Sequence, residues 1–385
     1  MRDFVLDRLL TWVARRPGWA FFVTLAWIPL LNASPFGDLS HWYTDHLHHS
    51  FATWVALKEG IAIYTRPFSE IRAGTGWPYP VNVWGNMPGF AYPPGVAVVF
   101  LPLTLLGSTH ALSPRAFGVV GVLYMLAISS VAFHAVVSTL RSAATGDRVA
   151  VGVLAWLLLS QVGLQGFFDS AYVACGAFMV LSLRNGKPDR ALLWLAAALM
   201  LHFRSAVLFP LGADAAWQAI RGTRVSAFPR RTSMALGTCG VAGAVSVASF
   251  ILMYPATEGF REQAIRVLSN QNAQIIVASM SLVVGALLLI SREYLALATL
   301  AVVVALAEVE VQNFWWHGLM VLFVPLTIGL RSARTPPQAE TGSIQSSLPT
   351  MMRAGALLWC FAIHPVVWRD HPGEVFTEFV KFFRI

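Results

Sequence analysis

Residues 116–140 read AFGVVGVLYMLAISSVAFHAVVSTL and contain no Asp, Glu, Lys or Arg. A helix needs about 20 mostly apolar residues to cross the hydrocarbon core of a bilayer, so this run is long enough to span a membrane. Similar apolar runs recur along the chain, at 18–34, 149–167, 170–184, 191–204, 204–220, 232–255, 274–291, 293–311, 315–331 and 352–368. We therefore expect an all-α polytopic membrane protein, with about eleven transmembrane helices in a single integral membrane domain over residues 1–385.

The composition favours the same class. Of the 385 residues, 56% are hydrophobic and 12% are charged, whereas a soluble domain carries about 25% charged residues. These values argue against a soluble monomer, a disordered chain and a small disulfide scaffold. Cys175, Cys239 and Cys360 lie singly in apolar runs, so we interpret them as buried small residues. The net charge of +8 indicates basic loops beside a lipid bilayer and no nucleic-acid partner.

One apolar run, Pro93–Gly107, is about 15 residues long, a length that suits a re-entrant or interfacial helix. If this run does not cross and the N-terminus is cytoplasmic, the cytoplasmic side receives 17 of the 27 Lys and Arg residues, as the positive-inside rule requires. Counting the run as a span would place the basic clusters at 184–190 and 221–231 outside. We therefore predict a first extracytoplasmic loop over 35–115 and a flexible cytoplasmic linker over 335–350. The cytoplasmic basic residues are Arg2, Arg8, Arg15, Arg16, Arg141, Arg148, Arg184, Lys187, Arg190, Arg221, Arg224, Arg230, Arg231, Arg292, Arg331, Arg334 and Arg353.

The first loop contains a segment, 44–59, that predicts a helix lying on the membrane surface. On it Asp45, His48, His49 and Ala52 share one side by i, i+3, i+4, i+7 spacing. A carboxylate at the start of such a helix, partly stripped of water, can act as a general base toward a hydroxyl group. The alternative is that Asp45 only caps the helix, with Thr44 as a rival for that role.

Further polar residues gather at the predicted outer ends of spans. Ionisable groups at membrane depth are expensive and usually face a cavity. Arg204 needs an anionic partner from elsewhere, either a phosphate or a carboxylate, because a guanidinium suits both. The carboxylates open to it are Asp169, Glu308 and Glu310. The whole set comprises Gln165, Asp169, His202, Arg204, Glu308, Glu310, Gln312, Trp316 and His317.

The histidines and tryptophans of the first loop each have two interpretations. Four histidines, His41, His46, His48 and His49, could suggest a divalent metal. They lack the HExxH pattern, and adjacent His48 and His49 point apart on a helix, so a metal is not favoured. The tryptophans either belong to the membrane-interface belt or offer flat apolar faces to sugar rings. These are Trp42, Trp54, Trp77 and Trp84.

Five stretches, taken in chain order, resemble the GT-C glycosyltransferases, which are multi-span enzymes that use polyprenyl-phosphate sugars. The acidic loop of GPI mannosyltransferase I and of the bacterial polyprenyl-phosphomannose-dependent mannosyltransferases is similar to YTDHLHHSFATWVALKEGIAIYTRPF (43–68). There an acidic residue precedes a helix, then a Gly and an aliphatic-x-Tyr, here Asp45, Gly60 and Tyr64. The other four stretches resemble the family's Tyr-Pro-Pro helix, an outer turn with Gln and Asp, a basic outer turn and a late aromatic turn. They are FAYPPGVAVVFLPLTLLG (90–107), GLQGFFDSAYVACGAFMVLSL (163–183), LHFRSAVLFP (201–210) and VQNFWWHGLMVLFVPL (311–326).

The resemblance implies an inverting sugar transfer, most often of mannose, from a polyprenyl-phosphate donor to a hydroxyl of a glycolipid, polysaccharide or protein. Asp45 would be the general base on the extracytoplasmic face. The donor phosphate would bind Arg204, His202 and Arg66. The sugar and the acceptor would bind Asp38, His49, Tyr64, Tyr92, Gln165, Asp169, Trp316 and His317. The chain departs from the family in being short and in lacking a DxD or paired adjacent carboxylates, and Asp38 is the only nearby second acid.

Two other functional classes stay open. A transporter or flippase carries its ionisable residues at mid-bilayer on broken helices, whereas here they fall at predicted outer ends. A membrane acyl- or phosphotransferase needs a His or Ser nucleophile with a base partner. His49 or His317 could be that nucleophile, although the spacing offers neither a partner. The usage of Ala, Val, Arg and Trp indicates a bacterial inner membrane.

Overall fold

The computed structural model describes residues 15–32, 44–60, 64, 76–77, 79, 92–141, 143, 145–164, 166–221, 230–267, 271–309 and 319–330. Of 32, 44–45, 59, 253–267, 271–280 and 307–309, only the backbone is described. The predicted linker at 335–350 and the predicted span at 352–368 lie outside these residues.

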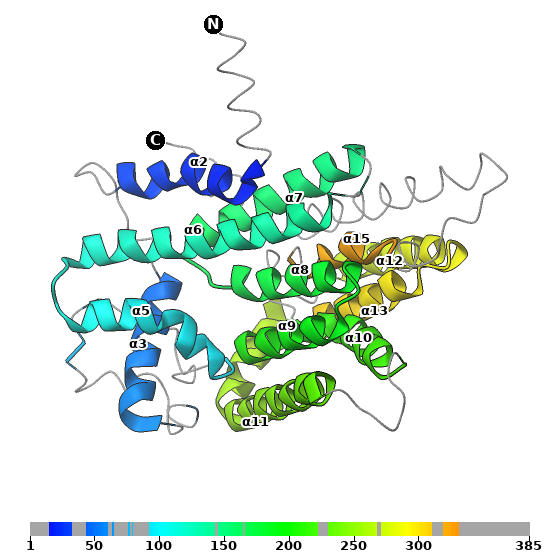
Figure 1. Cartoon of the computed structure of the whole chain (residues 1–385). Coiled ribbons are helices and arrows are strands. Elements are labelled where there is room, and N and C mark those ends of the chain that lie inside the picture. The colour runs from blue at the N-terminus through cyan, green and yellow to red at the C-terminus, as the bar shows by residue number, and fades with distance from the viewer. Residues whose placement is uncertain are drawn as a thin grey trace, which may run out of the picture.

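The described part of the chain is all-α, as the sequence predicts, and it contains no strand (Figure 1). Its elements are α2 (Pro17–Asn32), α3 (Thr44–Glu59), α5 (Gly95–Ser108), α6 (Pro114–Thr139), α7 (Thr145–Leu164), α8 (Ser170–Arg184), α9 (Pro188–Leu201), η2 (Phe203–Leu208), α10 (Phe209–Arg221), α11 (Arg230–Val267), α12 (Gln271–Ile290), α13 (Tyr294–Val309) and α15 (Phe323–Thr327).

Three segments among the described residues are long and apolar enough to cross a membrane by length and composition: α6, α7 and Arg230–Leu252 of α11. The runs predicted as spans at 170–184 and 191–204 form α8 and α9, which have 15 and 14 residues and so fall short of the about 20 that a full span needs. The run 204–220 divides into η2 and α10. Further short apolar helices are Pro17–Leu31, Gly95–Ser108, Ser281–Ile290 and Tyr294–Leu306.

Helices α6, α7, α8 and α9 follow one another back and forth, and their ends are set by local signals. The side chain of Ser113 caps α6 by accepting a hydrogen bond from the Ala116 amide at 3.2 Å, and Pro114 occupies the first turn. Small residues let the helices approach closely. A Cβ on Gly163 of α7 would lie 2.7 Å from the hydroxyl of Ser129 on α6. The Ser129 hydroxyl in turn lies 2.6 Å from that of Ser170 on α8.

The two ends of this bundle differ in charge. The connections α6–α7, α8–α9 and α12–α13 lie toward the right of Figure 1, and the turns after α5, α7 and α9 lie toward the left. The right-hand end, called the basic end below, also holds the end of α10 and the start of α11 (Figure 1). By sequence, these connections and helix ends contain Arg141, Arg148, Arg184, Lys187, Arg190, Arg221, Arg230, Arg231 and Arg292. The left-hand end, called the site end below, carries the two turns that hold Asp169 and Arg204.

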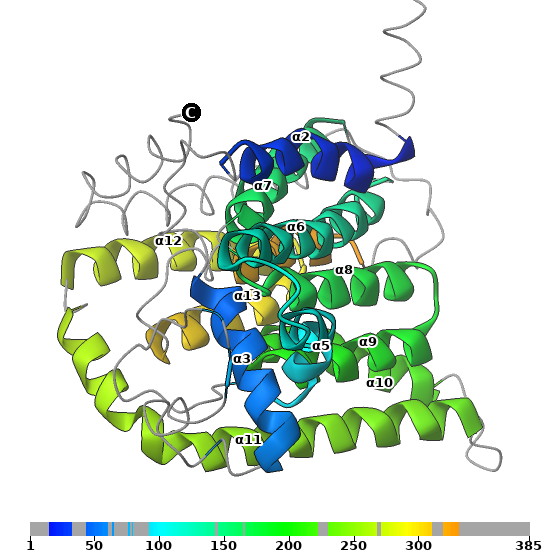
Figure 2. The ribbon, with the colours of Figure 1, turned by 90° about the vertical axis from the view of Figure 1, so that its left-hand side faces the viewer.

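Helices α3 and α5 cover the site end. α3 runs steeply across the direction of α6, α8 and α9 in both Figures 1 and 2, and its bounds match the helix predicted over 44–59. α5 has 14 residues, which rise about 21 Å and cannot cross a hydrocarbon core of about 30 Å. It begins against α9, where a Cβ on Gly95 would lie 2.5 Å from the carbonyl oxygen of Met200. A short helix at Pro93–Gly107 agrees with the sequence prediction.

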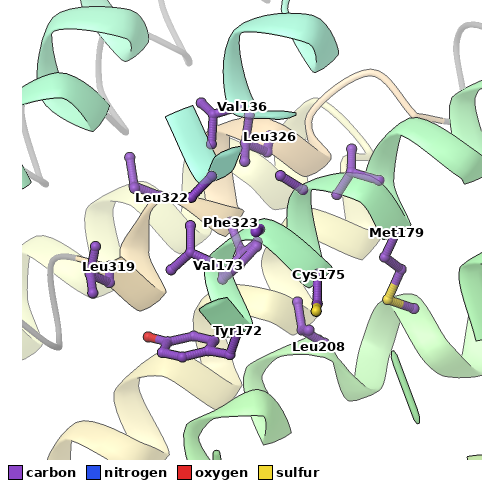
Figure 3. Close-up of a cluster of buried hydrophobic side chains, with 14 of the residues drawn as sticks. Val136, Tyr172, Val173, Cys175, Met179, Leu208, Leu319, Leu322, Phe323 and Leu326 are labelled. Atoms are coloured by element: carbon purple, nitrogen blue, oxygen red, sulfur yellow. The ribbon is translucent and has the colours of Figure 1, made fainter. Parts of the chain in front are cut away.

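The main core extends from α2 through α6–α10 to α13 and residues 319–330, and Figure 3 shows the part of it where α8 packs against α15. Phe323 is fully buried, and a Cβ on Gly176 of α8 would overlap its ring. Cys175 is buried in the same cluster, as the sequence predicts. Cys239 is half-buried, and Cys360 lies outside the described residues. This packing fixes α8, and therefore the turn at its N-terminus, relative to the last described helix.

Candidate active site

A buried ion pair joins two turns of the site end. Nη1 of Arg204, at the start of η2, donates to Oδ1 of Asp169 at 2.8 Å. Nε2 of His202 lies 3.3 Å from the same oxygen. The three side chains are at most 6% exposed. Asp169 precedes α8 and, among the described residues, makes no capping bond to that helix. Its carboxylate is therefore directed to the α9–η2 turn.

The hydrogen bonds of His202 fix its tautomer. Nδ1 accepts a hydrogen bond from the Arg204 backbone amide at 3.0 Å, so this nitrogen carries no proton. The proton of the neutral ring then resides on Nε2, which lies 3.3 Å from Oδ1 of Asp169. Nη1 of Arg204 lies 3.0 Å from this Nε2, so all three side chains of the cluster are in mutual contact. Oδ1 of Asp169 thus accepts a hydrogen bond from Arg204 and lies beside Nε2 of His202.

Aromatic rings surround this ion pair. The ring of His202 lies 5.1 Å from that of Tyr92, 5.8 Å from Phe168 and 5.3 Å from Tyr172, measured between centroids. His49 of α3 lies 5.0 Å from both Tyr92 and Phe168. These contacts bring together residues from α3, the segment before α5, the α7–α8 turn and the α9–η2 turn. The charges therefore lie in an apolar setting, where electrostatic interactions are stronger than in water.

Tyr64 ties a further part of the first loop to the same place. Its hydroxyl donates to the carbonyl oxygen of Tyr92 at 2.9 Å. Burial raises the pKa of Tyr64 to about 12, and a side-chain hydrogen bond with Ser249 of α11 opposes that rise. The phenol therefore stays protonated at neutral pH and keeps its role as a donor. One residue thus links the first loop, the segment before α5 and α11.

The structure brings together five of the residues that the sequence assigned to phosphate, sugar or acceptor: His49, Tyr92, Asp169, His202 and Arg204. Tyr64 is attached to this group through Tyr92. The remaining predicted residues fall outside what the structure describes. For Asp45, in the first turn of α3, only the backbone is described. Asp38, Arg66, Gln165, Trp316 and His317 lie outside the described residues.

The open question of the Arg204 partner is answered among the described side chains by Asp169. Glu308 and Glu310, the other two carboxylates considered, lie outside the described side chains. Of the surface-helix residues, His49 and Ala52 are buried and His48 is half-buried. Among the described residues, no group of three or more His, Cys, Asp or Glu side chains could hold a metal ion.

Sequence reasoning missed the apolar lining of the site. Phe168 contacts His49, Tyr92, Phe100 and His202 with its ring. Its position immediately before Asp169, in the turn GFFD, is the signal that could have found it. His46 is fully buried at the start of α3, although the sequence treated it only as one of four loop histidines.

Comparison with known proteins adds no relative. No protein-family model matches the chain, and no curated protein sequence matches it. The functional proposal therefore stands on the residues, on their geometry and on the resemblance described above.

Proposed function

We propose that this chain is an integral membrane glycosyltransferase of the GT-C kind, which moves a sugar, with mannose the first to test, from a polyprenyl-phosphate donor to a hydroxyl acceptor. One observation carries the proposal. Four separate stretches of the resemblance, containing His49, Tyr92, Asp169 and Arg204, converge at one end of the bundle. If the four stretches resembled the family only by chance, nothing would bring their residues into contact, so the contacts support the resemblance.

The proposed reaction is a single inverting displacement. Asp45 takes the proton of the acceptor hydroxyl while that oxygen attacks the anomeric carbon. The bond between the anomeric carbon and the phosphate oxygen breaks, and polyprenyl phosphate leaves with the electron pair. Because charge grows on the leaving phosphate, a fixed cation should stabilise the transition state. No metal or cofactor enters this scheme.

Arg204 is the proposed cation, with His202 and Arg66 beside it. Its Nη1 bond to Asp169 supports a role in which the carboxylate fixes the direction of the guanidinium. A guanidinium carries five N–H donors in a rigid fork, so the Nη1 bond is compatible with a second anion. On this view Asp169 orients the phosphate-binding group, which modifies the sugar- or acceptor-binding role that the resemblance implies for it.

The distribution of charge supports an orientation in the membrane. Basic residues at the end opposite the site fit a cytoplasmic location under the positive-inside rule. The proposed protein then has a cytoplasmic N-terminus and an extracytoplasmic site in a bacterial inner membrane. Its proposed spans number about eleven and include α8 and α9, which are shorter than the about 20 residues of a full span. A glycolipid, polysaccharide or protein in that compartment would supply the acceptor hydroxyl.

The direct test uses the purified chain in nanodiscs with radiolabelled polyprenyl-phosphate mannose and a panel of hydroxyl acceptors. We expect labelled product from the wild type and none from Asp45→Asn, with both proteins folded. The anomeric configuration of the product should be inverted relative to the donor. Full turnover by Asp45→Asn would remove the base assignment, and a product of retained configuration would exclude the single displacement. Uptake of a solute into proteoliposomes without sugar transfer would favour a transporter instead.

A further inference from the structure

The ring of His46 fills a slot between two glycines. His46 stands in the first turn of α3 and is fully buried. On one side, a Cβ added to Gly121 of α6 would overlap the imidazole ring. On the other side, a Cβ added to Gly166 would lie 2.5 Å from Nδ1 of His46, which is closer than van der Waals contact permits. The slot therefore has this width only because neither residue carries a side chain.

Gly166 has a second reason to be glycine. Its φ of +74° lies in the left-handed region, which residues with a Cβ rarely adopt. This conformation turns the chain from α7 toward α8, and the turn ends at Asp169. The His46 ring therefore packs on the turn that presents the Asp169 carboxylate to Arg204.

Hydrogen bonds from two side-chain hydroxyls to backbone carbonyls hold the start of α3 in the same place. The hydroxyl of Ser50 donates to the carbonyl oxygen of His46 at 2.7 Å. The hydroxyl of Thr104 on α5 donates to the carbonyl oxygen of Ser50 at 3.0 Å. Ser50 and Thr104 are both fully buried. The first turn of α3 is thus fixed to α5 by hydrogen bonds, and to α6 and the α7–α8 turn by the His46 ring.

We infer that His46 is a positioning residue, whose ring locks the first turn of α3 against Gly121 and Gly166 and so holds Asp45 in register with the Asp169–Arg204 pair. The inference rests on the proposed function, because it assigns His46 no chemistry of its own. Asp45 is the neighbour of His46 in the sequence, so a shift of this turn moves the backbone that carries the proposed base. A displacement of 1 Å away from the productive geometry can cost about 100-fold in rate.

The test compares four variants with the wild type in the sugar-transfer assay. Gly121→Ala pushes the ring out of the slot, and we expect it to lower kcat about tenfold or more with little change in KM. His46→Ala removes the ring without a clash, and we expect a similar loss of kcat. The double variant should be no worse than His46→Ala alone, because the added methyl then occupies the space of the missing ring. Gly152→Ala in α7 is the control, since no described atom lies within 4 Å of a Cβ there.

A purely structural role for His46 would give a different pattern. The yield of folded protein would fall, whereas kcat per folded molecule would stay at the wild-type value. That pattern in His46→Ala, which creates no overlap and should fold, overturns the inference. Losses in kcat that multiply in the double variant overturn it as well, because they show that Gly121 and His46 act separately.

A second readout separates this inference from the proposed function. The thermal unfolding of the same four variants in detergent reports the contact between His46 and Gly121 without any substrate. Non-additive shifts in Tm, with a wild type that transfers no sugar, would refute the proposed function while leaving the slot in place. Additive shifts in Tm would refute the slot, whether or not the wild type is active.

Discussion

Replacing Asp169 by Asn tests the buried ion pair, because the substitution removes the charge and keeps the shape. Oδ1 of Asp169 accepts from Nη1 of Arg204 at 2.8 Å and lies 3.3 Å from Nε2 of His202. Both partners are nearly completely buried. Breaking a buried ion pair by removing one partner costs about 3–5 kcal/mol. Since an amide oxygen can still accept a hydrogen bond, we expect the lower end of that range, about 3 kcal/mol of unfolding free energy.

The measurement is equilibrium unfolding in mixed detergent micelles, with a second substitution that removes the opposite charge. Replacing both members of a buried pair by neutral groups is often close to neutral for stability. Adding Arg204→Met to Asp169→Asn should therefore recover most of the lost free energy. Asp189→Asn is the control. This half-buried carboxylate accepts from the hydroxyl of Thr232 at 2.9 Å, so its loss should cost about 1 kcal/mol or less.

Two results would refute the reasoning. A loss below about 1 kcal/mol in Asp169→Asn would mean that the charge of Asp169 does not hold the buried guanidinium. A double variant as unstable as the single variant would mean that the cost comes from packing and not from an unbalanced charge. Activity is recorded separately, since the proposed mechanism predicts that both variants lose turnover.

Three further predictions concern other parts of the structure. Tyr64→Phe should cost about 1 kcal/mol at neutral pH through the lost bond to Tyr92. The pKa of Tyr64 rises from 10.0 to about 12 on folding, so its contribution to the free energy of unfolding is complete below pH 10 and is lost as the pH rises toward 12. Between those pH values the unfolding free energy of Tyr64→Phe should therefore fall less steeply than that of the wild type. Gly176→Ala should lower the free energy of unfolding by about 1–3 kcal/mol because its methyl overlaps Phe323. Gly237→Ala is the control, since no described atom lies within 4 Å of a Cβ there, and equal losses in the two variants would contradict the packing of α8 on Phe323. Two single-cysteine variants, His110→Cys and Lys187→Cys, test the topology in a cysteine-free background, since both positions are exposed. Impermeant thiol reagents should label them from opposite sides of the membrane. Labelling of both from the same side would overturn the proposed topology.

The fold class and one helix boundary could be predicted because they depend on local pattern. Apolar runs define helices wherever they occur, and the helix at 44–59 follows from its own spacing. The lengths of the apolar helices near 170–184 and 191–204 could be predicted, but the sequence could not decide whether helices of this length cross the bilayer. Hydropathy measures which residues avoid water, but a short apolar helix buried among other helices has the same composition as a spanning one. Gly186, with a φ of +64°, lies in the short turn that follows α8 and leads into α9.

The site was predictable as a list of residues and only partly as an arrangement. The sequence predicted that Asp169 and Arg204 lie at the outer ends of spans. It left three carboxylates, Asp169, Glu308 and Glu310, as possible partners of Arg204. The choice depends on how α8 packs against η2, which no local spacing specifies. His46 shows the same limit more sharply. Its ring packs against two glycines, Gly121 and Gly166, that lie far away in the sequence, and the role proposed for it depends on those contacts.

The pairing of Arg204 has a physical origin in the length of α9. Arg184, Lys187 and Arg190 flank its start at the basic end, and its 14 residues rise about 21 Å, less than the about 30 Å of a hydrocarbon core. If those basic side chains mark the membrane surface, His202 and Arg204 lie below the opposite surface, at a depth where an unpaired cation is expensive. Asp169 supplies the opposite charge at that depth, and the rings of Tyr92 and Phe168 cover the pair beneath α3 and α5.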